Sequence, residues 1–206
     1  MNVDAREHWD DVWSSRAADS VSWFQPDARL SLALVTRLAP SLTSSVVDVG
    51  GGASPLVGQL HALGYRDLTL VDVSSFALQQ ARAGLASAVA DDIEFVAADI
   101  TEWRPSRTFD VWHDRALFHF LLTEEHQRAY ASAVSNAVPP GGHLVIGVFA
   151  ANGPTMCSGL PVVRRGADEL AAVFDPDFEL LGSTGDDHTT PDGRTQEFVF
   201  ATFRRR

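Results

Sequence analysis

Three consecutive glycines, Gly50-Gly51-Gly52, follow a short apolar run at 45–49 and precede a segment with helical spacing. Glycine lets the backbone turn tightly and lets a ligand approach it closely. A strand, a glycine-rich turn and a helix in this order are typical of the ligand-binding turn of an open α/β sheet. The alternative, a plain strand-to-helix turn, does not require three glycines in a row.

The rest of the chain continues this alternation of apolar runs and helical patterns. Apolar runs predict strands at 45–49, 68–73, 93–97, 109–112 and 143–149. Helical spacing predicts helices at 4–17, 27–39, 55–63, 75–88, 124–138 and 166–174. Strands at 178–182 and 196–203, joined by a polar turn at 185–193, indicate an antiparallel hairpin. The sequence therefore predicts an α/β fold, doubly wound, with a mostly parallel sheet and helices on both faces.

Composition limits the class of protein and its partners. A length of 206 residues suits one domain, 1–206, with parts at 1–40, 41–150 and 151–206. The net charge of -11 argues against nucleic acid as a partner. We expect no membrane span and a cytoplasmic location, as a monomer or homodimer. The single cysteine, Cys157, offers no cluster for a metal, so we expect none.

Acidic residues at two strand ends indicate which cofactor the glycine turn serves. The third glycine of a dinucleotide fingerprint and the lysine of a P-loop are both absent after Gly52. This disfavours a nicotinamide oxidoreductase. Asp72 ends the second strand, where a carboxylate can accept both hydroxyls of a ribose, although it could also cap the next helix, as could Ser74. Asp99 follows the third strand, where it could accept the amino group of adenine or be a plain loop acid.

Together, Asp48-x-Gly50-x-Gly52, Asp72 and Asp99-Ile100 resemble the class I S-adenosylmethionine-dependent methyltransferases over residues 42–150. The resemblance implies a seven-stranded sheet, completed by the C-terminal hairpin, and S-adenosyl-L-methionine as cofactor. Ser54 departs from the pattern, since many members have glycine there, and it could cap the next helix or bind the cofactor. The residues that the resemblance assigns to the cofactor are Asp48, Gly50, Gly51, Gly52, Asp72, Val73, Asp99, Ile100 and His113.

The segment HDRALFHF at 113–120 should face the transferred methyl group, according to the same resemblance. His113 is the first candidate for a general base because imidazole titrates near neutrality, with Asp114 second and His119 third. A structural network that includes an Asp114–Arg115 pair is the alternative. Together with the N-terminal HWDDVW and SWFQ, this segment resembles an uncharacterised bacterial subgroup of methyltransferases, and distantly some protein-lysine methyltransferases.

Aromatic residues near the N-terminus predict a lid. Trp9, Trp13, Trp23 and Phe24 could cover a sulfonium cofactor, or they could simply pack the first helix onto the sheet. The residues expected to line the substrate site are Trp23, Phe24, Arg115, Phe149, Cys157 and His188. A small molecule with an O, N or S nucleophile is the expected methyl acceptor. A protein lysine, or binding of the cofactor without catalysis, are the alternatives.

Overall fold

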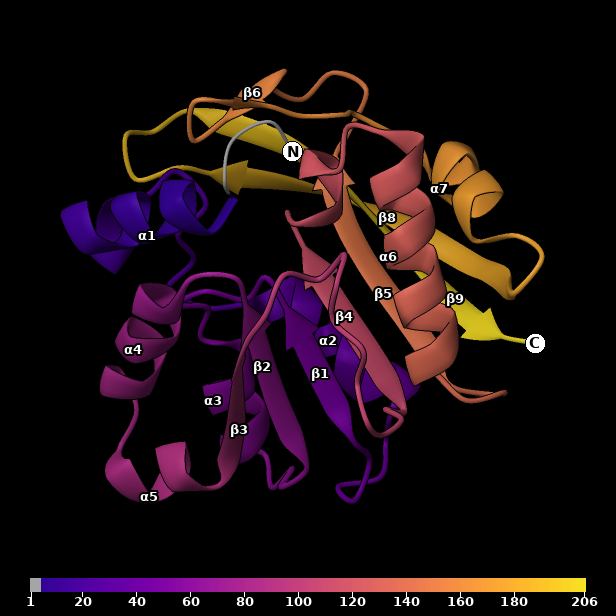
Figure 1. The fold of residues 1–206 in the computed structure, drawn as a ribbon, viewed down its shortest axis with the longest axis horizontal. Helices are drawn as coiled ribbons and strands as arrows, with labels where there is room; N and C mark the ends of the chain where they lie inside the picture. Colours follow the sequence, from indigo (N-terminus) through magenta and orange to yellow (C-terminus); the bar gives the residue numbers. More distant parts are fainter. Residues whose placement is uncertain (1–4) are drawn as a thin grey trace.

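The computed structural model describes residues 5–206; residues 1–4, which include the first residue of the helix predicted at 4–17, lie outside the described part. Its main sheet has the order β3-β2-β1-β4-β5-β9-β8 (Figure 1). The strands of this sheet are β1 (Val46–Val49), β2 (Leu68–Asp72), β3 (Ile93–Ala97), β4 (Val111–Arg115), β5 (His143–Phe149), β8 (Phe178–Thr189) and β9 (Thr195–Arg205). Only β9 runs antiparallel to the other strands, and it pairs with β8 as the predicted antiparallel hairpin, so the predicted seven-stranded, mostly parallel sheet is confirmed.

Helices cover both faces of the sheet, as predicted (Figure 1). The helices are α1 (Ala5–Ser15), α2 (Arg29–Leu38), α3 (Leu56–Ala62), α4 (Ser75–Ala83), α5 (Ser87–Asp91), α6 (Glu124–Ala137) and α7 (Ala167–Phe174), with short 3-10 turns η1 (Ala18–Ser20) and η2 (Phe118–Phe120). One apolar core lies between the sheet and α2, α3 and α4, and the other lies between the sheet and α6 and α7. The central strands are buried on both faces, which explains their continuous apolar runs.

Three predicted boundaries need correction. The helix expected at 75–88 ends at Ala83, and a separate α5 follows Gly84. The fourth strand begins at Val111 and continues through Arg115, because it pairs with β1 and β5 along that length. The polar turn expected at 185–193 is mostly strand, since β8 pairs with β9 as far as Thr189. An edge strand can be polar because one of its sides faces solvent.

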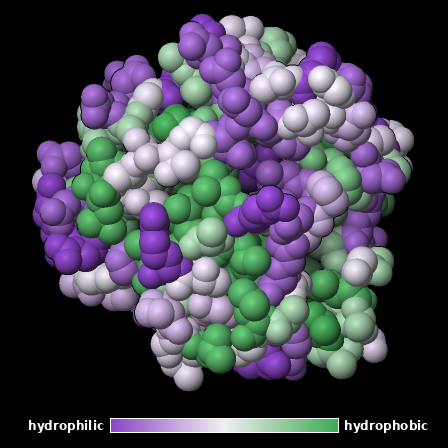
Figure 2. Space-filling view, turned by 180° about the vertical axis from the view of Figure 1, so that it is seen from behind, coloured by the Kyte–Doolittle hydropathy of each residue, from purple (hydrophilic) through white to green (hydrophobic). Residues whose placement is uncertain are grey.

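The loop expected after β5 contains a small hairpin of its own, β6 (Met156–Cys157) and β7 (Leu160–Pro161). In Figure 1, this hairpin and the turn between β8 and β9 lie on the same side of the sheet as α1. Seen from behind, hydrophobic residues gather toward the middle of the surface, with hydrophilic residues around them (Figure 2). Within residues 5–206, no helix combines the length and the apolar character needed to cross a bilayer.

Candidate active site

The glycine turn after β1 depends on two residues with left-handed backbone angles. Gly50 has φ +63° and Gly52 has φ +52°, a conformation that side chains other than glycine rarely adopt. A Cβ on Gly50 would lie 2.5 Å from Leu117 Cδ1, and one on Gly51 would lie 2.6 Å from Asp48 Oδ2. The turn can therefore bring its backbone close to neighbouring groups only because it lacks side chains.

Asp72, at the end of β2, is tied to the glycine turn. Its carboxylate accepts hydrogen bonds from the backbone nitrogens of Gly52 at 3.0 Å and Ser74 at 2.9 Å. Burial, the largest cause, raises the pKa of Asp72 to about 6, although both backbone bonds favour the charged form. Ser74, not Asp72, caps α4 through its hydroxyl. A carboxylate has room for further donors beyond these two bonds.

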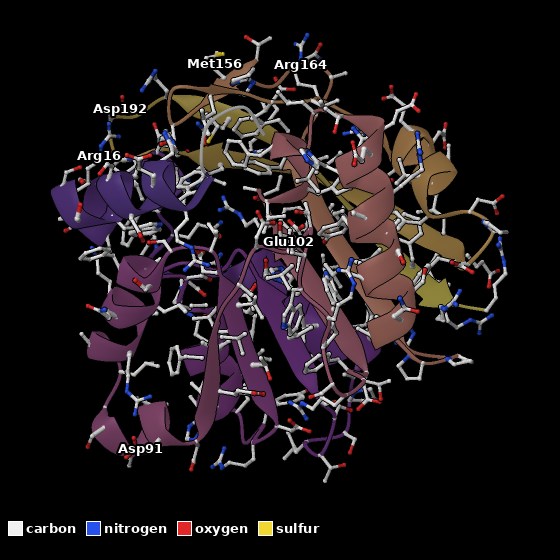
Figure 3. All side chains as sticks on the ribbon, viewed as in Figure 1. Arg16, Asp91, Glu102, Met156, Arg164 and Asp192 are labelled. Atoms are coloured by element: carbon white, nitrogen blue, oxygen red, sulfur yellow. The ribbon has the colours of Figure 1, made fainter. Side chains whose placement is uncertain are left out.

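Asp99 lies in the turn that follows β3. Its Oδ1 accepts hydrogen bonds from the backbone nitrogen of Thr101 at 2.8 Å and from the Thr101 hydroxyl at 2.7 Å. These bonds hold the side chain in a local turn of the kind that aspartate commonly forms. In Figure 3, the label on Glu102 marks this turn beside the end of β4.

The three sheet-edge segments meet in one cleft of about 790 Å³, including its open mouth. Gly50, Asp72, Val73, Asp99 and Ile100 all line it. The remaining lining residues are Ala5, Trp9, Trp13, Trp23, Val71, Ala98, Arg115, Ala116, Leu117, Phe120, Leu121 and Cys157.

Comparison with known proteins agrees with this arrangement. Residues 46–142 match a family model described as "Methyltransferase domain". The fold matches the N-methyltransferase NodS from Bradyrhizobium japonicum, solved with S-adenosyl-L-homocysteine, at a TM-score of 0.71 with 20% identity over 95% of this chain and 97% of that one. It also matches a methyltransferase from Anabaena variabilis at a TM-score of 0.73, with 16% identity over 99% of this chain and 96% of that one. Residues 46–142 therefore carry a methyltransferase domain, and the chain around them has the fold of these solved methyltransferases.

Sequence relatives of the methyltransferase include the human and bovine proteins named "eEF1A lysine and N-terminal methyltransferase". They are 25% and 26% identical over 123 residues, which is 59% of this chain. The match spans only 17% of each relative's length.

Aromatic side chains from the N-terminal segment of the methyltransferase form one wall of the cleft. Trp23 makes edge contacts with Trp9 and Trp13, at ring-centroid distances of 5.7 and 5.9 Å. Trp9 also contacts Phe120 at 5.1 Å. A Cβ on Gly52 would lie 2.6 Å from Trp13, so this ring rests directly on the glycine turn. The same side chains therefore pack α1 and border the cleft, and their role as a cover over a sulfonium cofactor stays a prediction.

A second cavity of about 460 Å³, also including open space, adjoins the first. Four residues line both cavities: Trp13, Trp23, Gly50 and Arg115. The second cavity adds Asp48, Gly51, Ser54, Phe24 and His113. The backbone nitrogen of Leu56 donates to the Ser54 hydroxyl at 3.2 Å, so Ser54 does bond the start of α3.

The candidate base His113 is engaged at both ring nitrogens. Its Nδ1 lies 2.7 Å from Asp48 Oδ1, and its Nε2 lies 2.9 Å from the Ser31 hydroxyl. All three side chains are buried. As a general base, His113 would have to give up one of these bonds, and its catalytic role stays a prediction.

Asp114 and His119 do not border either cavity within the described residues, contrary to the expectation that the whole segment faces the methyl group. Alternation along β4 places Asp114 on the opposite face from His113, where it accepts bonds from the Tyr130 hydroxyl and the backbone of Leu117 and Phe118. Burial raises the pKa of Asp114 to about 6. Burial also lowers the pKa of His119 to about 3, so this imidazole is neutral at neutral pH.

The predicted substrate residues divide into two groups. Trp23, Arg115 and Cys157 line the main cleft, and Phe24 lines the second cavity. Phe149 is fully buried below His119, at a ring-centroid distance of 4.6 Å, and does not border a cavity in the described part of the chain. His188 Nε2 lies 2.8 Å from the carbonyl oxygen of Ser22, so it ties the β8–β9 hairpin to the N-terminal segment instead. Phe149 and His188 could contact a substrate, as predicted, only in a different conformation of the protein.

Sequence reasoning missed seven cleft residues: Leu117 and Phe120, and also Ala5, Val71, Ala98, Ala116 and Leu121. Leu117 and Phe120 lie in the segment at 113–120, of which only polar residues were predicted to be in the site. The apolar residues between its polar ones were the available signal, because a cofactor cleft is lined mainly by apolar side chains.

Proposed function

We propose that this chain transfers the methyl group of S-adenosyl-L-methionine to an O, N or S nucleophile of a small molecule. The observation that carries the proposal is the meeting of Gly50, Asp72 and Asp99 in one cleft, because these residues come from three separate strand ends. The described residues, 5–206, form one domain, in which the aromatic N-terminal segment is a wall of the site. Asp48 supports the turn from below.

Each residue that would hold the cofactor has a role that suits its environment. Asp72 accepts the ribose hydroxyls, because its carboxylate is oriented by two backbone nitrogens. Asp99 accepts the adenine amino group, beside Ile100. The backbone of the glycine turn passes beside the methionine part, where a Cβ would obstruct it. When bound, the cofactor supplies an electrophilic methyl group on a sulfonium.

The aromatic wall supports methyl transfer by position and by exclusion of water. Trp9, Trp13 and Trp23 line the cleft together with the residues at the strand ends. Aromatic faces attract cations, so they suit a sulfonium that loses its charge as the methyl group leaves. Such a displacement depends more on alignment and a dry site than on strong acid–base chemistry.

A small acceptor is favoured by the residues that line the cleft. Arg115, Phe120 and Cys157 line it together with Trp9 and Trp13 of α1. The fold also matches, at a TM-score of 0.71, an N1-methyltransferase from Burkholderia thailandensis solved with its small substrate 1,6-didemethyltoxoflavin and S-adenosylhomocysteine. That neighbour is 21% identical over 99% of this chain and 85% of its own.

A protein amine is the second candidate acceptor. It is favoured by the sequence match to the eEF1A lysine and N-terminal methyltransferases, although this match covers only 17% of the length of those proteins. A lysine side chain would have to enter past the aromatic wall, since Trp9 and Trp23 border the cleft.

Two measurements test the function. Thermal unfolding with S-adenosylhomocysteine, S-adenosylmethionine and NAD should show stabilisation by the first two only, through binding to the folded state. Radiolabelled methyl transfer into a cell lysate, divided into protein and small-molecule fractions, should place label in the small-molecule fraction. Label in protein would favour the amine of a protein, and label in neither, with cofactor still bound, would favour a binding protein without catalysis.

A further inference from the structure

Arg115 ends β4 with two of its three guanidinium nitrogens unpaired within the described part of the chain. Its Nη1 donates to the carbonyl oxygen of Trp23 at 3.1 Å. Its Nε and Nη2 are buried and have no hydrogen-bond partner among residues 5–206. The side chain lines both cavities. Buried donors without partners are rare in folded proteins, so they call for a specific explanation.

The positive charge of Arg115 also lacks a direct partner in the part of the chain that the structure describes. No carboxylate of the described residues forms an ion pair with it, although Asp186 and Asp48 lie within electrostatic range. Burial lowers the pKa of Arg115 to about 10, which leaves the guanidinium charged at neutral pH. The ring of Phe198 lies 4.6 Å below it and offsets part of the charge. A buried cation in this state stabilises a bound anion.

The two free nitrogens have a defined shape. Nε and Nη2 form one edge of the planar guanidinium, and their N–H groups point in parallel. This edge matches the two oxygens of a carboxylate, which can accept both bonds at once. A single-point anion would use only one of them.

The direction of the Arg115 side chain separates a bound anion from the residues that would hold the cofactor. Apart from His113 on β4, the residues assigned to the cofactor lie on β1 and β2 or in the turns after β1, β2 and β3. The Arg115 guanidinium instead lies over Phe198 of β9, and β5 separates β9 from β4 in the sheet. Cys157, which also lines the cleft, lies within electrostatic range of it. The anion site is therefore on the far side of β4 from the adenosine acids.

We propose that Arg115 binds a carboxylate of the methyl acceptor, so that the acceptor is a small organic acid with its nucleophile on the same molecule. The inference rests on the proposed function. Trp9, Trp23 and Phe120 border the same cleft, so the body of the acid is apolar or aromatic. The net charge of -11 makes this cation a selective feature, because the protein as a whole repels anions.

Benzoate and benzamide are a matched pair of probes, since they share a ring and differ in the charge of one group. Their binding to protein saturated with S-adenosylhomocysteine can be measured by ligand-observed NMR titration. We expect benzoate to bind about 10-fold more tightly than benzamide or better, as is typical of hydrogen bonds to a charged group. Arg115→Met should remove this preference while the dissociation constant of S-adenosylhomocysteine changes less than about 3-fold. Arg115→Lys, which keeps the charge and loses the paired donors, should retain a reduced preference.

Arg37→Met is the control, because Arg37 is exposed on α2 and borders neither cavity, and it should leave the preference intact. Equal binding of the two probes by the wild type, or a preference that survives in Arg115→Met, would overturn the inference. So would a large loss of S-adenosylhomocysteine affinity in Arg115→Met, because it would assign the cation to the cofactor. If the wild type fails to bind S-adenosylhomocysteine, the proposed function itself fails. If Arg115→Met does not fold, a full preference in Arg115→Lys contradicts the paired-donor geometry and a reduced one supports it.

Discussion

The Nδ1 of His113 lies 2.7 Å from the Oδ1 of Asp48, and both side chains are 2% exposed. This contact joins β4 to β1 directly below the glycine turn. The other ring nitrogen of His113 reaches Ser31 on α2, so one imidazole connects three elements. The register of the sheet makes the contact possible, because Asp48 and His113 are direct partners across the two parallel strands.

Replacement of His113 by leucine should destabilise the protein markedly. It would leave the buried Asp48 carboxylate and the Ser31 hydroxyl without a partner, at a cost of about 3 kcal/mol in the free energy of unfolding. His61→Leu is the matched control, because His61 also contacts an aspartate, Asp92, at 2.9 Å, but that partner is 50% exposed. Its loss should cost under about 1 kcal/mol. Urea unfolding measures both, and equal losses would contradict the role of burial.

The same residue can be tested as a base. If His113 only positions Asp48, then His113→Asn should weaken S-adenosylhomocysteine binding and lower kcat without removing a limb of the pH–rate profile. A general base would behave differently, because its loss removes the limb that reports its titration and costs about 100-fold or more in rate. Cofactor binding would then be unchanged.

Gly52→Ala should damage both the glycine turn and the aromatic wall. The added Cβ would lie 2.6 Å from Trp13, on a residue whose φ is +52°. We expect a loss of about 2 kcal/mol in unfolding free energy and about 10-fold in S-adenosylhomocysteine affinity. Calorimetric titration measures the affinity.

Gly141→Ala separates the two causes. Gly141 has φ +84°, but a Cβ there would meet nothing within 4 Å. It should cost only about 1 kcal/mol of backbone strain, with cofactor affinity intact. If it reduced the affinity as much as Gly52→Ala, the contact with Trp13 would be irrelevant.

Much of the fold follows from local pattern, because the central strands are buried on both faces and are apolar throughout. The run at 143–149 coincides with β5 for this reason. The run at 93–97 also coincides with β3, although β3 is an edge strand that is only partly buried. The distal part of β8 could not be found in this way. Residues such as Asp186 and Asp187 suit a turn locally, and only their pairing with Phe198 and Glu197 makes them strand.

The candidate site divides along the same line. Asp72 and Asp99 were predictable because each ends a strand, and the ends of parallel strands share one edge of the sheet. The directions of the side chains at 113–120 were not predictable, because they depend on how far β4 continues. Once the strand extends to Arg115, alternation turns Asp114 away from His113 and leaves it with Tyr130. No local pattern reports that extension.

Asp10→Ala should loosen α1 without unfolding the sheet. Asp10 Oδ1 accepts a hydrogen bond from the Ser74 hydroxyl at 2.6 Å, which anchors α1 to the start of α4. Loss of one side-chain bond at a partly buried site costs about 1 kcal/mol locally. We expect faster amide hydrogen exchange in α1 and a few-fold weaker S-adenosylhomocysteine binding. Asp11→Ala, on the exposed side of the same helix, should change neither, and equal effects from both would exclude the anchor.

Asp72→Asn should weaken cofactor binding and stabilise the ligand-free protein. Burial raises the pKa of Asp72 to about 6 in the folded protein, from 3.8, so the folded state binds the proton more strongly than the unfolded state. The stability linked to this proton is fully present below pH 3.8 and is lost as the pH rises to about 6. Above pH 6, ligand-free Asp72→Asn should therefore be more stable than the wild type by up to about 3 kcal/mol.

Binding of the cofactor should show the opposite dependence on pH. An ionised Asp72 is the better acceptor for ribose hydroxyls, so the wild type should lose S-adenosylhomocysteine affinity below pH 6, approaching about 10-fold for each pH unit. Asp72→Asn should bind about 100-fold more weakly at pH 8 and lack this dependence. Calorimetric titrations between pH 5 and pH 8 measure both. Asp91→Asn, which removes an exposed carboxylate on α5, should reproduce the wild-type profile. A wild-type affinity that is flat across this range would show that the Asp72 carboxylate does not accept a hydrogen bond from the cofactor.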